Sequence, residues 1–390
     1  MQAECFLNIV IPAYKEPNIL SSLQSLYNCD KPRNKVELII VLNYPADDSP
    51  AIKTQTAETC ALLTKFITQN EPAWINTYLI EAYDLPTKKA GVGLARKIGM
   101  DEAAWRFNQI DKDGIIVCFD ADSLCQKNYL VSVEAAFLSN KKAVGASIYY
   151  EHPLQLEDGK LNTAIIQYEL HLRYYIQALA YCGYPFAYHT IGSSMAVRSS
   201  VYQKQGGMNT RKAGEDFYFL HKLIPLGNFL NINNTKVIPS ARESDRVPFG
   251  TGRAMQKQRS GEKSLNQTYN FESFEALRFF FEAITSHQPI DNIPAPIEAF
   301  LLNEQMLEEL KKIKEQAKSP NHFTERFFQW FNGFKVLKCV HYLRDNYFPE
   351  KPLTHEVQKL FNAYPPLSGH KNVISLSAQL TALREYEQTL

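Results

Sequence analysis

Two aspartates, Asp120 and Asp122, directly follow the apolar run IIVCF at 115–119. Carboxylates this close repel each other unless a cation or a proton lies between them. Hard divalent cations bind such oxygens and also bridge diphosphates. A structural alternative stays open, in which Asp122 caps the next helix. The position of the pair favours chemistry, because parallel sheets bind ligands at the carboxyl ends of their strands.

A second acidic pair, Glu215 and Asp216, follows Gly214 and begins the helical pattern EDFYFLHKL. Acidic residues in the first turn of a helix stabilise its positive end, and this structural interpretation also stays open. The chemical interpretation is a general base, because a carboxylate held beside a hydroxyl accepts its proton as a new bond forms.

Two basic segments could bind phosphate. Gly91 begins a glycine-bearing loop, GVG, that leads into a helical pattern with Arg96. Exposed amides at a helix start favour an anion, although a plain turn is the alternative. The stretch 241–260 holds four arginines. Among these we expect Arg246 beside a diphosphate, because the guanidinium fork suits phosphate oxygens; a solvated basic loop is the alternative.

The elements that must position these residues alternate in type. Apolar runs without polar alternation predict strands buried on both faces, and helical spacing separates them. The expected strands are 7–11, 36–42, 75–83, 115–119, 143–150 and 191–198, and the expected helices are 19–27, 54–68, 92–107, 128–138 and 161–181, with another from Glu215. Such repetition predicts an α/β fold with a mostly parallel sheet flanked by helices.

The pattern changes near residue 262. From there prolines separate helical segments, and strand-like alternation is absent. The expected helices are 271–285, 297–317, 323–345 and 356–364. We therefore predict a first domain over 1–261 and a helical C-terminal subdomain over 262–390.

Composition narrows the class of protein. The 390 residues carry 42 basic and 41 acidic side chains and are 45% hydrophobic, so the chain is globular and unsuited to binding nucleic acid by bulk charge. The seven cysteines form no CxxC motif and are expected to be reduced. We also predict the location of the protein.

The sequence indicates neither a signal peptide nor a transmembrane helix. The expected location is cytoplasmic, with peripheral contact at the inner face of the membrane as an option.

Six motifs in order resemble family 2 glycosyltransferases of the GT-A fold, which is Rossmann-like. They are LNIVIPAYKEP (7–17), GVGLARKIG (91–99), FDADS (119–123), IGSSMAVR (191–198), GGM (206–208) and GEDFYFLHKL (214–223). The resemblance spans roughly residues 6 to 260. It implies an enzyme that moves a sugar from a nucleotide-diphosphate sugar to an acceptor hydroxyl.

The resemblance also implies roles on the donor side. The residues expected to line the nucleotide are Pro12, Ala13, Tyr14 and Glu16. Asn43 stands where the family usually has an Asp that reads the base, and the expected nucleotide is still uridine. Arg96 would face the base or the diphosphate.

At the reacting end, the resemblance implies that Asp120 contacts the ribose and that Asp120 and Asp122 hold Mn²⁺ or Mg²⁺. Gly192 and Ser193 would border the sugar and the acceptor. Asp216 would be the general base of an inverting transfer. Glu215 would contact acceptor or sugar hydroxyls.

Two other functions stay open. One is a retaining GT-A synthase that acts on a small phosphorylated acid, which GVGLARK also resembles. The other is a GT-A-shaped binding protein without catalysis. The acceptor is unidentified; a saccharide, a lipid-linked molecule and a small molecule all remain candidates.

Overall fold

The computed structural model describes residues 4–155, 159–242, 250–260, 264–286 and 293–390. These residues fold into two compact units. The first unit takes in the described residues of 1–159 and 190–256, and the second takes in those of 160–189 and 257–389. The expected boundary between residues 261 and 262 stays a prediction.

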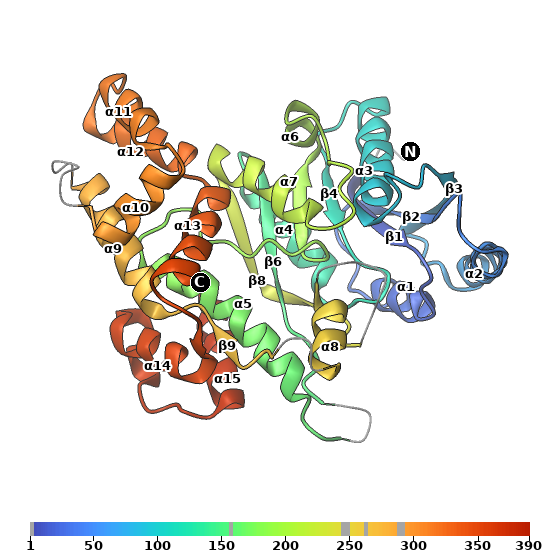
Figure 1. Cartoon of the computed structure of the whole chain (residues 1–390). Helices are drawn as coiled ribbons and strands as arrows, with labels where there is room; N and C mark the ends of the chain where they lie inside the picture. The colour runs from blue at the N-terminus through green and yellow to red at the C-terminus, as the bar shows by residue number, and fades with distance from the viewer. Residues whose placement is uncertain (1–3, 156–158, 243–249, 261–263, 287–292) are drawn as a thin grey trace. The chain divides into compact units, whose positions relative to one another are not determined.

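Within the described residues, the first unit is built on an eight-stranded sheet in the order β3-β2-β1-β4-β7-β6-β8-β5 (Figure 1). The strands are β1 (Cys5–Ala13), β2 (Lys35–Pro45), β3 (Ile75–Leu85), β4 (Ile115–Cys118), β5 (Leu124–Cys125), β6 (Gly145–Tyr150), β7 (Met195–Arg198) and β8 (Phe229–Ile238). Strands β3, β2, β1 and β4 pair in parallel, as do β6 and β8. Strand β7 is antiparallel to β4 and β6. The predicted α/β fold with a mostly parallel sheet is confirmed.

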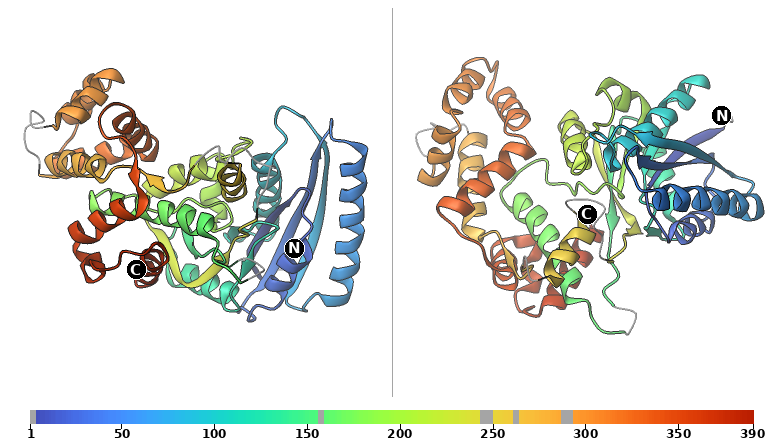
Figure 2. Two further views of the ribbon diagram at one scale, coloured as in Figure 1. Left: turned by 60° about the horizontal axis from the view of Figure 1, so that its bottom comes forward. Right: turned by 45° about the vertical axis from the view of Figure 1, so that its right-hand side comes forward.

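Helices cover both faces of the parallel part of this sheet. Helix α3 lies on one face, and α1 and α2 lie on the other (Figures 1 and 2). The helices are α1 (Ile19–Tyr27), α2 (Pro50–Asn70), α3 (Val92–Gln109), α4 (Tyr129–Ser139), α6 (Ser199–Lys204) and α7 (Glu215–Leu223), with a 3-10 turn, η1, at Ile224–Leu226. This arrangement explains the apolar runs IVI at 9–11 of β1 and LIIVL at 38–42 of β2, since both faces of these strands are buried.

Gly99 sets how closely α3 approaches the sheet. A Cβ atom at this position would lie 2.4 Å from Val10 Cγ1 on β1 and 3.0 Å from Val41 Cγ2 on β2. No larger side chain fits between the helix and these two strands without a shift. The helix that carries Arg96 is therefore held directly against the strands that end at the predicted site.

Several elements of the first unit differ from those expected, among them the short strand β5 and helix α6. Strand β8 was not expected, because Asn231, Asn233 and Asn234 interrupt its apolar positions and leave no continuous apolar run. The strand expected at 191–198 is confined to β7, since residues 192–194 form a turn. Helix α8 (Thr251–Arg259) replaces part of the expected loop, and positions 243–249, including Arg246, lie outside the described residues.

The second unit is helical, which confirms the predicted C-terminal helical region. Its helices are α5 (Thr163–Tyr181), α9 (Phe271–Thr285), α10 (Ala295–Asn303), α11 (Leu307–Glu315), α12 (Pro320–Trp330), α13 (Gly333–Asn346), α14 (Leu353–Ala363) and α15 (Leu376–Gln388), joined by β9 (Gln267–Thr268), β10 (Lys351–Pro352) and the 3-10 helix η3 (Pro365–His370). Buried aromatic rings of α9 and α12 stack edge to face in its core, as Phe280 and Phe327 do at 5.4 Å.

Two expected helices are each divided in two by a local motif. Between α10 and α11, Gln305 adopts φ 56°, and Met306 N–H closes the turn on Leu301 C=O. Between α12 and α13, Asn332 caps the new helix by accepting hydrogen bonds from Phe334 N–H and Lys335 N–H. Helical spacing continues through both motifs, so periodicity alone does not reveal them.

Across the part of the chain that the structure describes, no helix combines the length and the apolar character needed to cross a membrane.

Candidate functional site

Asp120 and Asp122 lie just past the carboxyl end of β4. The strand ends at Cys118, and Phe119 N–H still donates to Val10 C=O of β1. The side chains of Asp120 and Asp122 are 38% and 21% exposed, so both carboxylates can be reached from solvent. The expectation that Asp122 could cap the next helix is wrong, because α4 begins at Tyr129 with Asn128 at its N-cap.

Arg96 joins this pair to the second acidic motif. Its Nη2 donates to Asp120 Oδ1 at 2.6 Å, and its Nη1 donates to Glu215 Oε1. The arginine side chain is only 2% exposed. We expected Arg96 to face the base or the diphosphate, but both of its Nη groups are bound to carboxylates inside the protein.

Glu215 and Asp216 occupy the first turn of α7. Gly214 at the N-cap has φ 69°, a left-handed conformation that suits glycine. Glu215 points inward and is 3% exposed, whereas Asp216 is half-buried. Asp216 Oδ1 accepts a hydrogen bond from Phe217 N–H at 2.7 Å. The two acids therefore differ in access: Glu215 is enclosed beside Arg96, whereas Asp216 keeps a partly exposed surface.

Gly192 lies against both Arg96 and Asp216. A Cβ atom added to it would be 2.8 Å from Arg96 Nη1 and 3.0 Å from Asp216 Oδ2. Ser193, the next residue in the turn before β7, is 3% exposed. The absence of a side chain at Gly192 thus leaves room for the guanidinium and the second carboxylate to approach one another.

Burial and mutual repulsion alter the ionisation of this cluster. Burial raises the pKa of Glu215 to about 7, with Arg96 acting in the opposite direction and Asp216 adding to the rise. Burial likewise raises the pKa of Asp216, again opposed by Arg96. Burial disfavours the charge on Arg96 itself, but Glu215 and Asp120 more than compensate and raise its pKa. Such perturbed carboxyls in a polar cluster are typical of functional sites.

A second arginine, Arg242, links β1 to the acidic pair. Its Nη2 donates to Glu16 Oε2 and lies 3.4 Å from Asp122 Oδ2. Glu16 is 5% exposed and also accepts from Asn18 N–H at 2.9 Å. Glu16 and Asp122, predicted separately, are therefore brought together by Arg242.

Our sequence prediction selected Arg246 from the arginine-rich stretch, and that residue lies outside the described part of the chain. Arg242 was not selected. Recognising strand β8 would have pointed to Arg242. This strand runs parallel to β6 and ends at Ile238, which pairs with Leu124 of β5. Arg242 follows four residues after that end, at the edge of the sheet where Asp122 also lies.

The residues expected at the nucleotide lie at the ends of β1 and β2. Asn43 is 4% exposed, and its Nδ2 donates to Ala13 C=O at 3.0 Å and to Val41 C=O at 3.2 Å. Its side chain therefore fastens the two strand ends together. Tyr14 is half-buried, and its hydroxyl donates to Asp48 Oδ1 at 3.3 Å. Pro12, beside it, is half-buried as well.

Gly91 begins the turn into α3 and lies close to the segment before α7. A Cβ atom on Gly91 would be 3.2 Å from Lys212 Cα. The glycine loop and the acidic motif thus approach each other at the start of their two helices. Within the described residues, no group of three or more His, Cys, Asp or Glu side chains is arranged to hold a metal ion.

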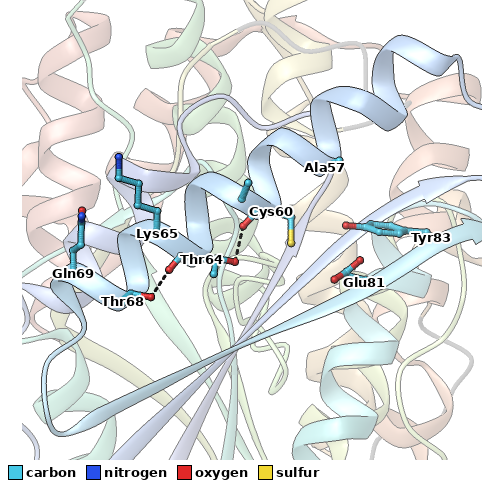
Figure 3. Close-up of a pocket in the computed structure, with 9 residues that line it drawn as sticks. Ala57, Cys60, Thr64, Lys65, Thr68, Gln69, Glu81 and Tyr83 are labelled. Atoms are coloured by element: carbon cyan, nitrogen blue, oxygen red, sulfur yellow. Dashed lines mark hydrogen bonds between the residues drawn. The ribbon is translucent and has the colours of Figure 1, made fainter.

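A pocket elsewhere in the first unit lies between α2 and β3 (Figure 3). The pocket is lined by Cys60, Thr64 and Lys65 of α2 and by Glu81 and Tyr83 of β3. None of the predicted site residues lines this pocket.

The sequence and the structure were compared with known proteins, and the sequence matches one protein family. The sequence model of glycosyl transferase family 2 matches residues 8–205, just over half of the chain. Among solved structures, Staphylococcus aureus TarS 1–349 in complex with UDP-GlcNAc is 14% identical at a TM-score of 0.40, covering 98% of this chain and 91% of that one. The same TarS fragment without the sugar nucleotide is 13% identical at a TM-score of 0.38, covering 99% and 92%.

A search of curated proteins found no match. The family match includes β1 from residue 8 onward, the glycine loop with α3, and the acidic pair after β4. The chain therefore belongs to glycosyl transferase family 2, whose members are glycosyltransferases that use nucleotide-sugar donors.

Proposed function

We propose that this enzyme transfers a sugar from a uridine-diphosphate donor to an acceptor hydroxyl, with a divalent cation and with inversion at the anomeric carbon. The supporting observation is that Arg96 brings Asp120 of one motif and Glu215 of the other onto one guanidinium. Acidic groups from stretches more than 90 residues apart thus share one site.

On the donor side, the strand ends offer a binding surface at the carboxyl edge of the sheet. Pro12, Ala13 and Tyr14 would border the base and ribose. Asn43 would act through the strand ends, because its amide is bonded to Ala13 C=O. Glu16 would orient Arg242 toward the diphosphate.

Asp120 and Asp122 fit Mn²⁺ or Mg²⁺. Their oxygens are the ligands that such cations prefer, and Mg²⁺ is commonly held by one or two carboxylates together with substrate phosphates. Both side chains are partly exposed. Arg242 Nη2 lies 3.4 Å from Asp122 Oδ2, so a second positive charge stands beside this carboxylate for the diphosphate. When bound, the cation would neutralise charge that develops on the departing diphosphate.

Asp216 is the proposed general base. It is half-buried at the start of α7, so its carboxylate can be reached by an acceptor. Asp216 accepts the proton of the acceptor hydroxyl while the hydroxyl oxygen bonds to the anomeric carbon, opposite to the departing diphosphate. Glu215 is enclosed beside Arg96 and would fix the position of this helix start.

The location we propose is the cytoplasm. All seven cysteines are free thiols, which suits a reducing compartment.

The donor is identified by a screen of free nucleotide sugars that measures slow hydrolysis. We expect hydrolysis of at least one uridine-diphosphate sugar, and calorimetry should show its binding in Mn²⁺ but not in chelator. Binding without any turnover on any acceptor would favour the non-catalytic alternative. Binding that is unchanged by chelator would overturn the metal assignment.

The stereochemical outcome is read by NMR of the product's anomeric proton. Inversion supports Asp216 as the base, because a single displacement changes the configuration. Retention would instead favour the retaining synthase.

A further inference from the structure

Two thiols from distant parts of the first unit face each other. Cys29 follows the end of α1, and Cys125 lies on β5, 96 positions later in the chain. Their Sγ atoms are 3.6 Å apart, and both are free thiols. A disulfide requires about 2.05 Å between the sulfurs. The two atoms thus need to approach by only about 1.5 Å.

The backbone around both residues is held in place. Asp30 N–H donates to Lys127 C=O at 2.8 Å, which joins the segments just beyond the two cysteines. Ser25 Oγ lies 3.7 Å from Cys125 Sγ. Cys29 Sγ also lies 3.5 Å from Ser25 C=O. The thiols therefore meet because their backbones are already fixed side by side.

The pair lies near the surface. Cys29 is 7% exposed, Cys125 is half-buried, and Leu124 beside it is 40% exposed. A molecule the size of hydrogen peroxide can therefore approach this strand end from solvent. Cys29 itself is buried, as are Cys5, Cys118, Cys182 and Cys339, so Cys125 is the more accessible thiol of the pair.

The contact between the two sulfurs also shifts the pKa values of the two thiols in opposite directions. The hydrogen bond from Cys125 lowers the pKa of Cys29, and the same bond raises the pKa of Cys125. The thiolate is the form that reacts with peroxides and disulfides. With Cys29 as the thiolate, Cys125 lies 3.6 Å away and is positioned to resolve its oxidised form.

We propose that Cys29 and Cys125 are a thiol modification site that forms a reversible intramolecular disulfide on exposure to peroxide. The Cys29 thiolate attacks one peroxide oxygen, breaks the O–O bond and becomes a sulfenic acid as hydroxide leaves. Cys125 then attacks the Cys29 sulfur, the new S–S bond forms, and the sulfenic oxygen departs as water. In sum, two thiols and one hydrogen peroxide give one disulfide and two waters.

The modification would act on the segment that carries the acidic pair. Strand β5 begins two residues after Asp122, and Ser22 Oγ of α1 donates to Asp120 C=O at 3.3 Å. A disulfide would fix the end of α1 to β5 covalently. The proposal stands on the thiol geometry alone and is independent of glycosyl transfer.

The test treats the full-length protein with dilute hydrogen peroxide, blocks the remaining thiols, and maps disulfide-linked peptides by mass spectrometry. We expect a peptide that joins Cys29 to Cys125, lost again on reduction with dithiothreitol, with two thiols per chain consumed. The oxidised protein should also have a higher Tm, since the bond closes a long loop of the unfolded chain.

Three variants make the test specific. C29S and C125S should each abolish the linked peptide, whereas C60S, which alters another half-buried cysteine, should leave it unchanged. Because the wild-type map is the primary result, a variant that fails to fold does not decide the outcome. Recovery of both thiols unmodified, or oxidation of either to sulfinic acid without a linked peptide, would overturn the proposal.

Discussion

Asp216 combines access with a perturbed acidity. It is half-buried at the start of α7, and burial raises its pKa. Asn has the same shape but cannot accept the acceptor's proton. We therefore expect Asp216→Asn to reduce the rate of transfer by about 10²–10⁴-fold, the usual contribution of general base catalysis. Calorimetric affinity for the donor should stay close to that of the wild type, and transfer at near wild-type rate would refute the assignment.

Replacing Gly192 with alanine changes the cluster of Arg96 and Asp216 less drastically. The Cβ of Gly192→Ala would lie 2.8 Å from Arg96 Nη1 and 3.0 Å from Asp216 Oδ2, so the guanidinium must shift and the carboxylate must yield slightly. We expect kcat to fall at least tenfold, because misplaced catalytic groups are costly. Steady-state kinetics and thermal melting would measure the effect.

Gly369→Ala is the matched control for this variant, because a Cβ at Gly369 meets no atom within 4 Å. Its kcat and Tm should equal those of the wild type. An unchanged kcat for Gly192→Ala would mean that Arg96 and Asp216 need not lie as close as they do here.

The sequence predicted which residues belong to the site, but it did not predict the ion pairs that join them. The acidic pairs could be located because each stands beside a recognisable strand or helix start. The burial of Arg96 could not be foreseen, because an arginine that binds phosphate and one that joins two carboxylates have the same local sequence. Arg242 was missed because the asparagines of β8 interrupt its apolar positions, so the strand that precedes Arg242 gives no apolar run.

At the scale of elements, buried charges join α15 to α5. Arg173 is fully buried and donates to Glu169 on its own helix and to Glu387 on α15. Burial favours the neutral form of Glu387, but Arg173 and His189 outweigh it and lower its pKa. The charged form of Glu387 is thus stabilised in the folded protein.

The pH dependence of stability follows from that lowered pKa. Glu387 stabilises the fold above its unfolded pKa of about 4.3, and the contribution is lost as the pH falls through the lower, folded value. At pH 7, Glu387→Gln should cost about 3 kcal/mol, as the loss of a partner from a buried ion pair does. Melting curves from pH 7 to pH 3 should show the wild type losing its advantage and converging with the variant. Parallel curves would contradict this.

The contact of α3 with the sheet gives another element-scale prediction. The methyl group of Gly99→Ala would overlap Val10 Cγ1. Overpacking costs about 1–3 kcal/mol, whereas alanine favours a helix over glycine by about 1 kcal/mol. We expect a net loss of about 1 kcal/mol in denaturant unfolding. Val10→Ala removes the clashing atom, so the double variant should be more stable than the sum of the two single effects predicts.

Most elements were predictable because of their periodicity. Strands β1, β2 and β4 are apolar on both faces, and α9 was expected at the residues where it lies. Periodicity failed where one residue ends a helix, as at Gln305, because the apolar spacing continues on both sides of the break.

On the scale of the whole molecule, the second unit is assembled from two stretches of chain. Helix α5 lies within it, between the two parts of the chain that form the first unit. The buried apolar residues of α5 include Ile165, Ile166, Leu170 and Tyr174. A single cut therefore cannot separate the two units.

A chain that ends at residue 261 tests the predicted domain boundary. It lacks α9 to α15, so we expect the apolar face of α5 to be exposed. Size-exclusion chromatography and dye binding should show association and strong dye fluorescence. A monomeric, cooperatively folded fragment 1–261 would instead support the boundary between residues 261 and 262.

The bond between Arg173 and Glu387 spans 214 positions, and this distance has a consequence for synthesis. At about 5–20 residues per second, α5 leaves the ribosome roughly 10–40 s before Glu387 is made. During that interval its apolar side chains gain their native partners one helix at a time, α9 first, then α14 and last α15. The core around α5 is therefore complete only once α15 has been made, and until then the buried charge of Arg173 lacks Glu387.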